Sequence, residues 1–201
     1  MSGFEMVFAL FGLLLGLAIA EVLAGFAQTW KARLRAEVAG TVPVRIGWLV
    51  PLLGLLVITD QTGFWLTAYA FRDSIPLTFA SLLAVLAVIG TYYLLATFVF
   101  PDEPEAWPDF DAYYLRINRI VIGGMLAING AAIAVALALE AAGQGIVEAE
   151  ARGPVGDVAL LLALPALTAL FFVKSKRANL ILLLLLNGLV LVEAVAGAWG
   201  V

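Results

Sequence analysis

The sequence predicts an all-α integral membrane protein, a single domain over residues 1–201 built as a bundle of about six transmembrane helices. Of its 201 residues, 64% are hydrophobic and only 13% are charged, whereas soluble domains contain about 25% charged residues. Several runs of about 20 apolar residues follow one another, each long enough to cross the ~30 Å hydrocarbon core as a helix. The strand alternation of a membrane β-barrel is missing, and helices satisfy their own backbone hydrogen bonds in lipid.

Six apolar runs are expected to form these helices, over about residues 4–29, 47–71, 75–100, 119–141, 155–173 and 178–199. The first run has no positive segment before it and exceeds the core of a signal peptide, so we expect it to remain as a helix. The second run carries a polar cluster around Asp60 at its centre, whereas the third contains no charged residue. Pro165 lies in the middle of the fifth run and is expected to kink that helix.

The eleven Lys and Arg residues predict the topology. All of them except Arg72 and Arg152 lie between the first and second, third and fourth, or fifth and sixth runs, at Lys31, Arg33, Arg35, Arg45, Arg116, Arg119, Lys174, Lys176 and Arg177. Under the positive-inside rule these three connections are cytoplasmic. Both termini are therefore expected outside, in a bacterial inner membrane.

The composition excludes several classes of function. The net charge of −4 is dispersed and includes no basic arm of the kind that binds nucleic acid. Cysteine and histidine are absent, which removes disulfides, thiol nucleophiles and the usual zinc and haem ligands. A membrane aspartyl protease needs two facing Asp residues, and Asp60 is the one that qualifies. We therefore predict no catalytic residue, no metal site and no cofactor.

The first two cytoplasmic connections differ in charge. The segment KARLRAEVAGTVPVR (31–45) is basic and contains a short amphipathic piece that could lie on anionic lipid. The segment PDEPEAWPDFDAYY (101–114) is acidic, and its prolines disfavour a continuous helix. Three interpretations stay open: the two segments pair with each other, both are solvated surface, or residues 101–114 dock a cytoplasmic partner.

Three carboxyl groups lie inside the apolar runs. Asp60 is near the bilayer midplane, where an ionised aspartate costs about 2.5–3.5 kcal/mol on insertion scales. Glu21 lies about 7 Å to the cytoplasmic side of the centre of its run, and Glu193 lies a similar distance to the outer side. The three acids therefore mark a candidate ion or proton pathway across the membrane.

No Lys or Arg lies in the middle of any run to neutralise these acids. An acid of this kind is either neutral and hydrogen-bonded to Gln61, Asn129 or Asn187, exposed to a wet cavity, or bound to a permeant cation. Gln61 and Asn129 are the partners that we predict to orient Asp60.

Small residues recur at every fourth position of the first run, at Gly12, Gly16, Ala20 and Ala24. Such a ridge permits close helix packing, either within the chain or between copies in a homo-oligomer.

Short motifs occur in three places: GLLLGLAIAEVLAGFA in the first run, the FW pair in the second, and YYLLATFVFPD running into DFDAYYLRINR. Together they resemble an uncharacterised group of small bacterial polytopic inner-membrane proteins of about this length. The resemblance covers most of the chain and implies a bacterial inner-membrane setting. That group has no assigned activity, so the resemblance implies no mechanism.

Two hypotheses of function follow. In the first, the protein conducts protons or small cations, or couples their transport, with Asp60 as the central site, Glu21 and Glu193 as relays, and Gln61 and Asn129 as hydrogen-bond partners. In the second, it is a non-transporting membrane scaffold or accessory subunit, whose acids are protonated and structural and whose 101–114 loop binds a cytoplasmic partner.

Overall fold

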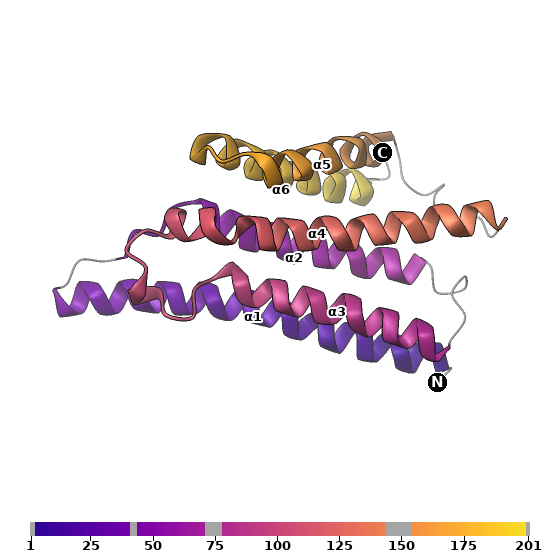
Figure 1. Ribbon diagram of the computed structural model, residues 1–201, viewed down its shortest axis with the longest axis horizontal. Helices are drawn as coiled ribbons and strands as arrows, with labels where there is room; N and C mark the ends of the chain where they lie inside the picture. The colour runs from indigo at the N-terminus through magenta and orange to yellow at the C-terminus, as the bar shows by residue number, and fades with distance from the viewer. Residues whose placement is uncertain (1–2, 41–43, 71–77, 144–153, 200–201) are drawn as a thin grey trace.

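The computed structural model describes residues 3–40, 44–70, 78–143 and 154–199, which form six α-helices and one 3₁₀ turn (Figure 1). The elements in chain order are α1 (Gly3–Ala39), α2 (Leu49–Ala70), α3 (Phe79–Val99), η1 (Pro104–Ala106), α4 (Phe110–Ala141), α5 (Pro154–Phe172) and α6 (Lys176–Trp199). Arg72 and Arg152, which the topology prediction places on the outer side, lie outside the described residues.

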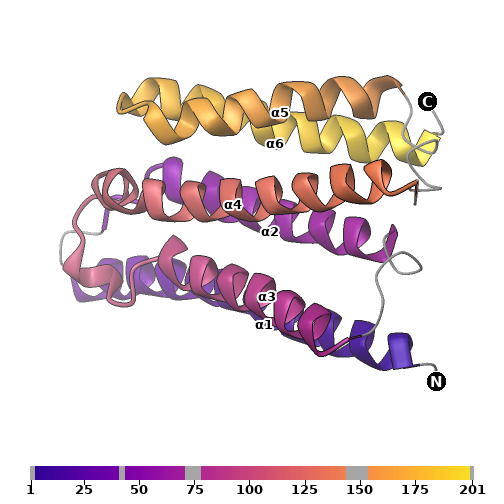
Figure 2. The same ribbon diagram turned by 45° about the vertical axis from the view of Figure 1, so that its right-hand side comes forward.

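The helices stack as three layers of two (Figures 1 and 2). The pair α1 and α3 forms one outer layer, α2 and α4 form the middle layer, and α5 and α6 form the other outer layer. The connections α1–α2, α3–α4 and α5–α6 lie together at one end of the bundle, which we call the basic end. Helix α1 begins and α6 ends at the opposite end, so the Lys and Arg residues of the three odd-to-even connections gather on one side.

The predicted fold class is confirmed. Five helices are long and apolar enough to cross a membrane: α1, α2, α3, α4 and α6. Helix α5 contributes the shorter apolar stretch Leu161–Phe172 over its described side chains and continues through Pro165. Large apolar side chains cover the outside of the bundle, among them Leu13, Leu17, Leu161, Ile181 and Leu191, each more than half exposed. Lipid is the solvent that such a surface fits, so the chain is a multi-pass membrane protein.

Two helix boundaries differ from the prediction because the helices continue beyond the apolar runs. Helix α1 extends to Ala39 instead of 29, so residues 31–39 of the basic segment are its last part and not a separate amphipathic piece. Helix α4 begins at Phe110 instead of 119, after the last proline of the acidic segment. Phe110, Tyr113 and Tyr114 bury one face of this extra stretch, and their spacing is that of a helix. The 101–114 loop therefore ends at Asp109.

The basic and acidic connections pair in part. The backbone N–H of Arg45 donates to the carbonyl of Pro108 at 3.1 Å, and the N–H of Phe110 donates to the carbonyl of Arg45 at 3.1 Å. Arg35 of α1 lies 3.5 Å from the carboxylate of Glu105 in η1. The ion pair is exposed and contributes little by itself, so the backbone bonds are what hold the α3–α4 connection against the α1–α2 connection.

A buried polar contact also fixes the start of α6. The hydroxyl of Tyr114 donates to Oδ1 of Asn179 at 2.7 Å, and both residues are fully buried. The amide nitrogen of Asn179 donates to the carbonyls of Val173 and Ser175 at 3.0 and 2.9 Å. These bonds tie the α5–α6 connection to α4 at the basic end.

Candidate functional site

The polar cluster in the middle of α2 is smaller than its sequence suggests. The hydroxyls of Thr59, Thr62 and Thr67 donate back to carbonyls of their own helix at 2.9–3.0 Å. Such bonds satisfy a hydroxyl locally in an apolar setting. The groups that need partners from other helices are therefore the carboxyl of Asp60 and the amide of Gln61.

The carboxyl of Asp60 joins three helices. The hydroxyl of Tyr92 in α3 donates to Oδ2 at 2.8 Å, and Nδ2 of Asn129 in α4 donates to Oδ1 at 3.0 Å. The same amide nitrogen of Asn129 also donates to the carbonyl of Met125 at 3.0 Å, which holds the side chain in position. Asn129, predicted as a partner of Asp60, is thus in contact with it. Among the described residues, no Lys or Arg pairs with this carboxyl.

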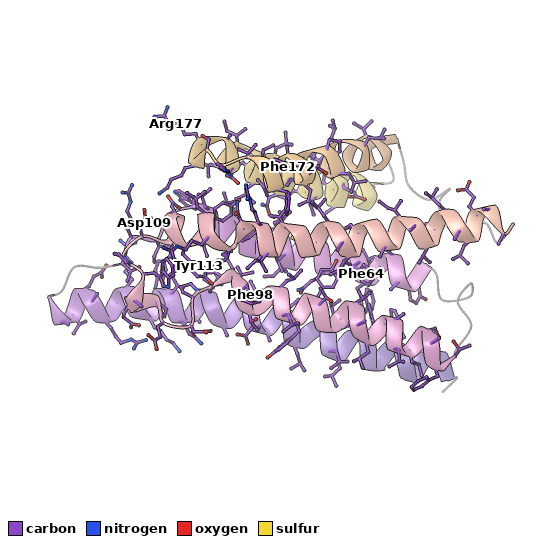
Figure 3. All side chains as sticks on the ribbon, in the orientation of Figure 1. Phe64, Phe98, Asp109, Tyr113, Phe172 and Arg177 are labelled. Atoms are coloured by element: carbon purple, nitrogen blue, oxygen red, sulfur yellow. The ribbon has the colours of Figure 1, made fainter. Side chains whose placement is uncertain are left out.

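Tyr92 was not predicted as a partner of Asp60. Its side chain is fully buried, and its ring makes an edge-to-face contact with Phe64, with centroids 5.4 Å apart. Figure 3 places Phe64 between the middle layer and the layer of α1 and α3. The neighbouring Tyr93 is 43% exposed, so the two tyrosines differ only in the direction that the helix gives them. The sequence feature that could have identified Tyr92 is its polar hydroxyl inside the third apolar run, which contains no charged residue.

The site can serve both protonation states of the acid. Two donors to two carboxylate oxygens suit the ionised form, because a carboxylate only accepts hydrogen bonds. When one oxygen of Asp60 carries a proton, the hydroxyl of Tyr92 can rotate to accept from it, since a phenol both donates and accepts. The arrangement can therefore hold a proton and release it without moving a helix.

Gln61 is not brought to Asp60. It lies on the same face of α2 as Gly54 and Trp65, at spacings of seven and four residues, and this face packs against α1. Its side chain is 0% exposed, and neither amide atom has a hydrogen-bond partner among the described residues. An unpaired buried amide costs about 1–3 kcal/mol per group, so this position calls for a polar partner inside the bundle.

The two other intramembrane acids are not among the hydrogen-bond partners of Asp60. Two close contacts fix the register of the antiparallel helices α1 and α2: Phe26 against Gly54, and Gly12 against Trp65. Interpolation between them puts Glu21 level with about position 58 of α2, roughly 3 Å nearer the basic end than Asp60 along the helix axis. Glu193 is half-buried on α6. Neither glutamate is a hydrogen-bond partner of Asp60.

Asn187, the third amide considered as a partner for an acid, instead binds backbone. It donates to the carbonyl of Leu52 in α2 at 3.2 Å and to the carbonyl of Leu183 in its own helix at 2.8 Å. This bond joins α6 to the middle layer and does not reach the site.

The small-residue ridge of α1 divides into two parts. A Cβ atom on Gly12 would lie 3.5 Å from Nε1 of Trp65, so this glycine packs within the chain. Gly16 and Ala20 are exposed, and a Cβ on Gly16 would meet nothing within 4 Å. Ala24 is half-buried. The middle of the ridge is free to meet another molecule.

Over the described ranges, no three acidic residues gather into a group that could hold a metal ion. Comparison of the chain with protein-family models, curated proteins and solved structures gave no match. The fold and the site therefore define the chain by class: an all-α multi-pass membrane protein with a hydrogen-bonded carboxyl group between three of its helices.

Proposed function

We propose that the protein conducts protons or small cations, or couples their transport, through Asp60. The observation that carries this proposal is the pair of polar groups at the centre of α2. Asp60 has hydrogen bonds from two other helices and no cationic partner among the described residues, and the adjacent Gln61 is fully buried with an unpaired amide. Intramembrane acids of this kind mark ion or proton paths, since a carboxyl without a role is selected against in lipid.

In this mechanism Asp60 takes up and releases the proton or contacts the cation. Tyr92 and Asn129 position the carboxyl through their hydrogen bonds. Glu21 and Glu193 serve as relays toward the two membrane faces through water, because neither is in hydrogen-bond contact with Asp60. Gln61 supplies a polar surface for water between α1 and α2.

The proposal includes a setting and an assembly. The positive-inside rule assigns the basic end to the cytoplasm of a bacterial cell, with both termini outside the inner membrane. The exposed Gly16 and Ala20 favour a homo-oligomer packed through α1.

The test is ion flux into liposomes that contain the purified protein. A pH-sensitive dye in the lumen reports proton entry. Cation entry is measured as potassium flux down an imposed potassium gradient. We expect flux from the wild type and its loss in Asp60→Asn. The matched control is Asp102→Asn, which removes an exposed acid at the basic end and should leave flux unchanged. Size-exclusion profiles and helical content establish that both variants are folded.

One observation favours the alternative class, a scaffold or accessory subunit. The carboxyl of Asp60 ties α2 to α3 and α4, which is a structural role that needs no transport. In a scaffold, the exposed acids Asp102, Glu103 and Glu105 of the α3–α4 connection would receive a cytoplasmic partner. Absence of flux from the wild type across pH and voltage, together with a less stable Asp60→Asn, would select this alternative.

A further inference from the structure

A pocket of about 600 Å³ lies at the basic end, away from Asp60. Its walls come from the C-terminal part of α1, the segment before α2, and the first turns of α4 and α6. Four cationic residues line it: Arg33, Arg45, Lys176 and Arg177. Pockets of this volume are of the size that binds small organic ligands.

Two of these cations have carboxylate partners and two do not. Arg33 pairs with Glu37 at 3.2 Å, and Lys176 pairs with Asp109 at 3.1 Å. Arg45 and Arg177 are exposed and make no ion pair within the described part of the chain, although the charge of Arg45 also acts on the carboxylate of Asp109. Figure 3 shows Arg177 extending outward at the start of α6, away from Asp109. Arg45 and Arg177 thus line the pocket as exposed cations outside any ion pair, and Arg is well suited to phosphate.

The pocket also contains a carboxylate. Asp111 lines the pocket, and a carboxylate only accepts hydrogen bonds; its Oδ1 is covered by the protein and has no partner among the described residues. Gly47 packs directly against this carboxylate, since a Cβ at position 47 would overlap it. A ligand that fits the pocket therefore carries a negative group for the arginines and a hydrogen-bond donor for Asp111.

The remaining walls are apolar and lie where the membrane surface should be. Leu49, Leu180 and Trp48 line the pocket, and Trp48 is 72% exposed. Exposed tryptophans are typical of the headgroup level of a bilayer. Free phosphate would gain nothing from the apolar walls, whereas the glycerol and upper acyl carbons of a lipid would pack on them.

We propose that this pocket binds the headgroup of a phospholipid, with its phosphate at Arg45 and Arg177 and a headgroup hydroxyl or ammonium at Asp111. Basic pockets between transmembrane helices on the cytoplasmic side bind anionic headgroups by the same chemistry. This proposal is independent of whether Asp60 transports an ion.

Native mass spectrometry of the purified full-length protein in detergent tests it, with phosphatidylglycerol, phosphatidylcholine of the same acyl chains, and inorganic phosphate as probes. Phosphatidylglycerol carries hydroxyl donors, and phosphatidylcholine has none. We expect phosphatidylglycerol to remain bound more tightly than phosphatidylcholine. The double variant Arg45→Gln/Arg177→Gln should weaken it about 30-fold, at about fivefold for each cation near the membrane surface.

Lys174→Gln is the matched control, because Lys174 is an exposed cation in the α5–α6 connection that does not line the pocket. Lys174→Gln should change the affinity for phosphatidylglycerol less than twofold if the cations of the pocket, and not the net charge of the whole basic end, bind the lipid. Equal weakening by Lys174→Gln would overturn the site. Equal affinity for phosphatidylcholine would overturn the role of Asp111. Displacement of the lipid by inorganic phosphate would overturn the lipid as the source of the phosphate.

Discussion

The hydrogen bond between Tyr92 and Asp60 gives the most direct prediction. Tyr92→Phe removes one hydroxyl and keeps the ring, so the packing against Phe64 should remain. Interhelical hydrogen bonds in a membrane protein average about 0.6 kcal/mol and reach about 1.7 kcal/mol. The bond at 2.8 Å is short, and its loss leaves Oδ2 of Asp60 without a donor. We therefore expect Tyr92→Phe to lower the free energy of unfolding by about 1 kcal/mol, or about fivefold in the equilibrium constant.

Unfolding of the protein from bicelles by added dodecyl sulfate, followed by tryptophan fluorescence, measures this change. Tyr93→Phe is the control, because Tyr93 is the adjacent tyrosine but is exposed; its effect should lie within about 0.5 kcal/mol of zero. The same two substitutions are then made in an Asp60→Leu background, which isolates the pairwise contribution.

Two results would refute this account of the site. If Tyr93→Phe destabilises the protein as much as Tyr92→Phe does, the loss comes from tyrosine replacement in general. If Tyr92→Phe has the same effect in the Asp60→Leu background, the hydroxyl stabilises the fold through a group other than Asp60.

Two further predictions concern the basic end and the packing of α1. Although burial opposes its ionisation, the hydrogen bond from Lys176, the N–H of Asp111 and the nearby positive charges lower the pKa of Asp109. The resulting stability is present above the ordinary aspartate pKa of about 3.9 and is lost as pH falls through the lowered pKa of the folded state. In Lys176→Met, the free energy of unfolding should therefore fall less steeply with pH below about pH 4. Gly25→Ala would put a Cβ into Phe100 and should destabilise by about 1–3 kcal/mol in the same bicelle assay. Within the single chain, Gly16→Ala meets nothing within 4 Å and should leave the stability of the monomer unchanged or raised; similar losses of monomer stability from both alanines would contradict the α1 packing.

Hydropathy was enough to predict the fold class, because apolar length decides whether a helix spans lipid. It could not place the ends of α1 and α4, because both helices continue past the bilayer for reasons that hydropathy does not contain. At Phe110 the reason is burial of one aromatic face against the bundle. At Ala39 the chain remains helical through charged residues that stay exposed.

The candidate site was predictable in its acid and in one partner. Asp60 and Asn129 stand out because each is a polar group in an apolar run, and such groups tend to meet. Tyr92 and Tyr93 are the same residue type and adjacent in sequence. Only the rotation of α3 relative to α2 decides that Tyr92 is buried against Asp60 and that Tyr93 is exposed. Gln61 was misplaced for the same reason: one residue along a helix turns the side chain by about 100°, which moves it from the α3–α4 side to the α1 side.

The contrast between Asp60 and Gln61 is what separates the two classes of function. A scaffold can use the Asp60 carboxyl as a tie between helices, since both of its oxygens have donors. The Gln61 amide is 0% exposed, and neither of its polar atoms has a partner among the described residues; each unpaired group costs about 1–3 kcal/mol unless a bound water or ion satisfies it. A path for water or an ion between α1 and α2 would satisfy that amide one residue from an intramembrane acid, and this is the feature that supports the transport proposal.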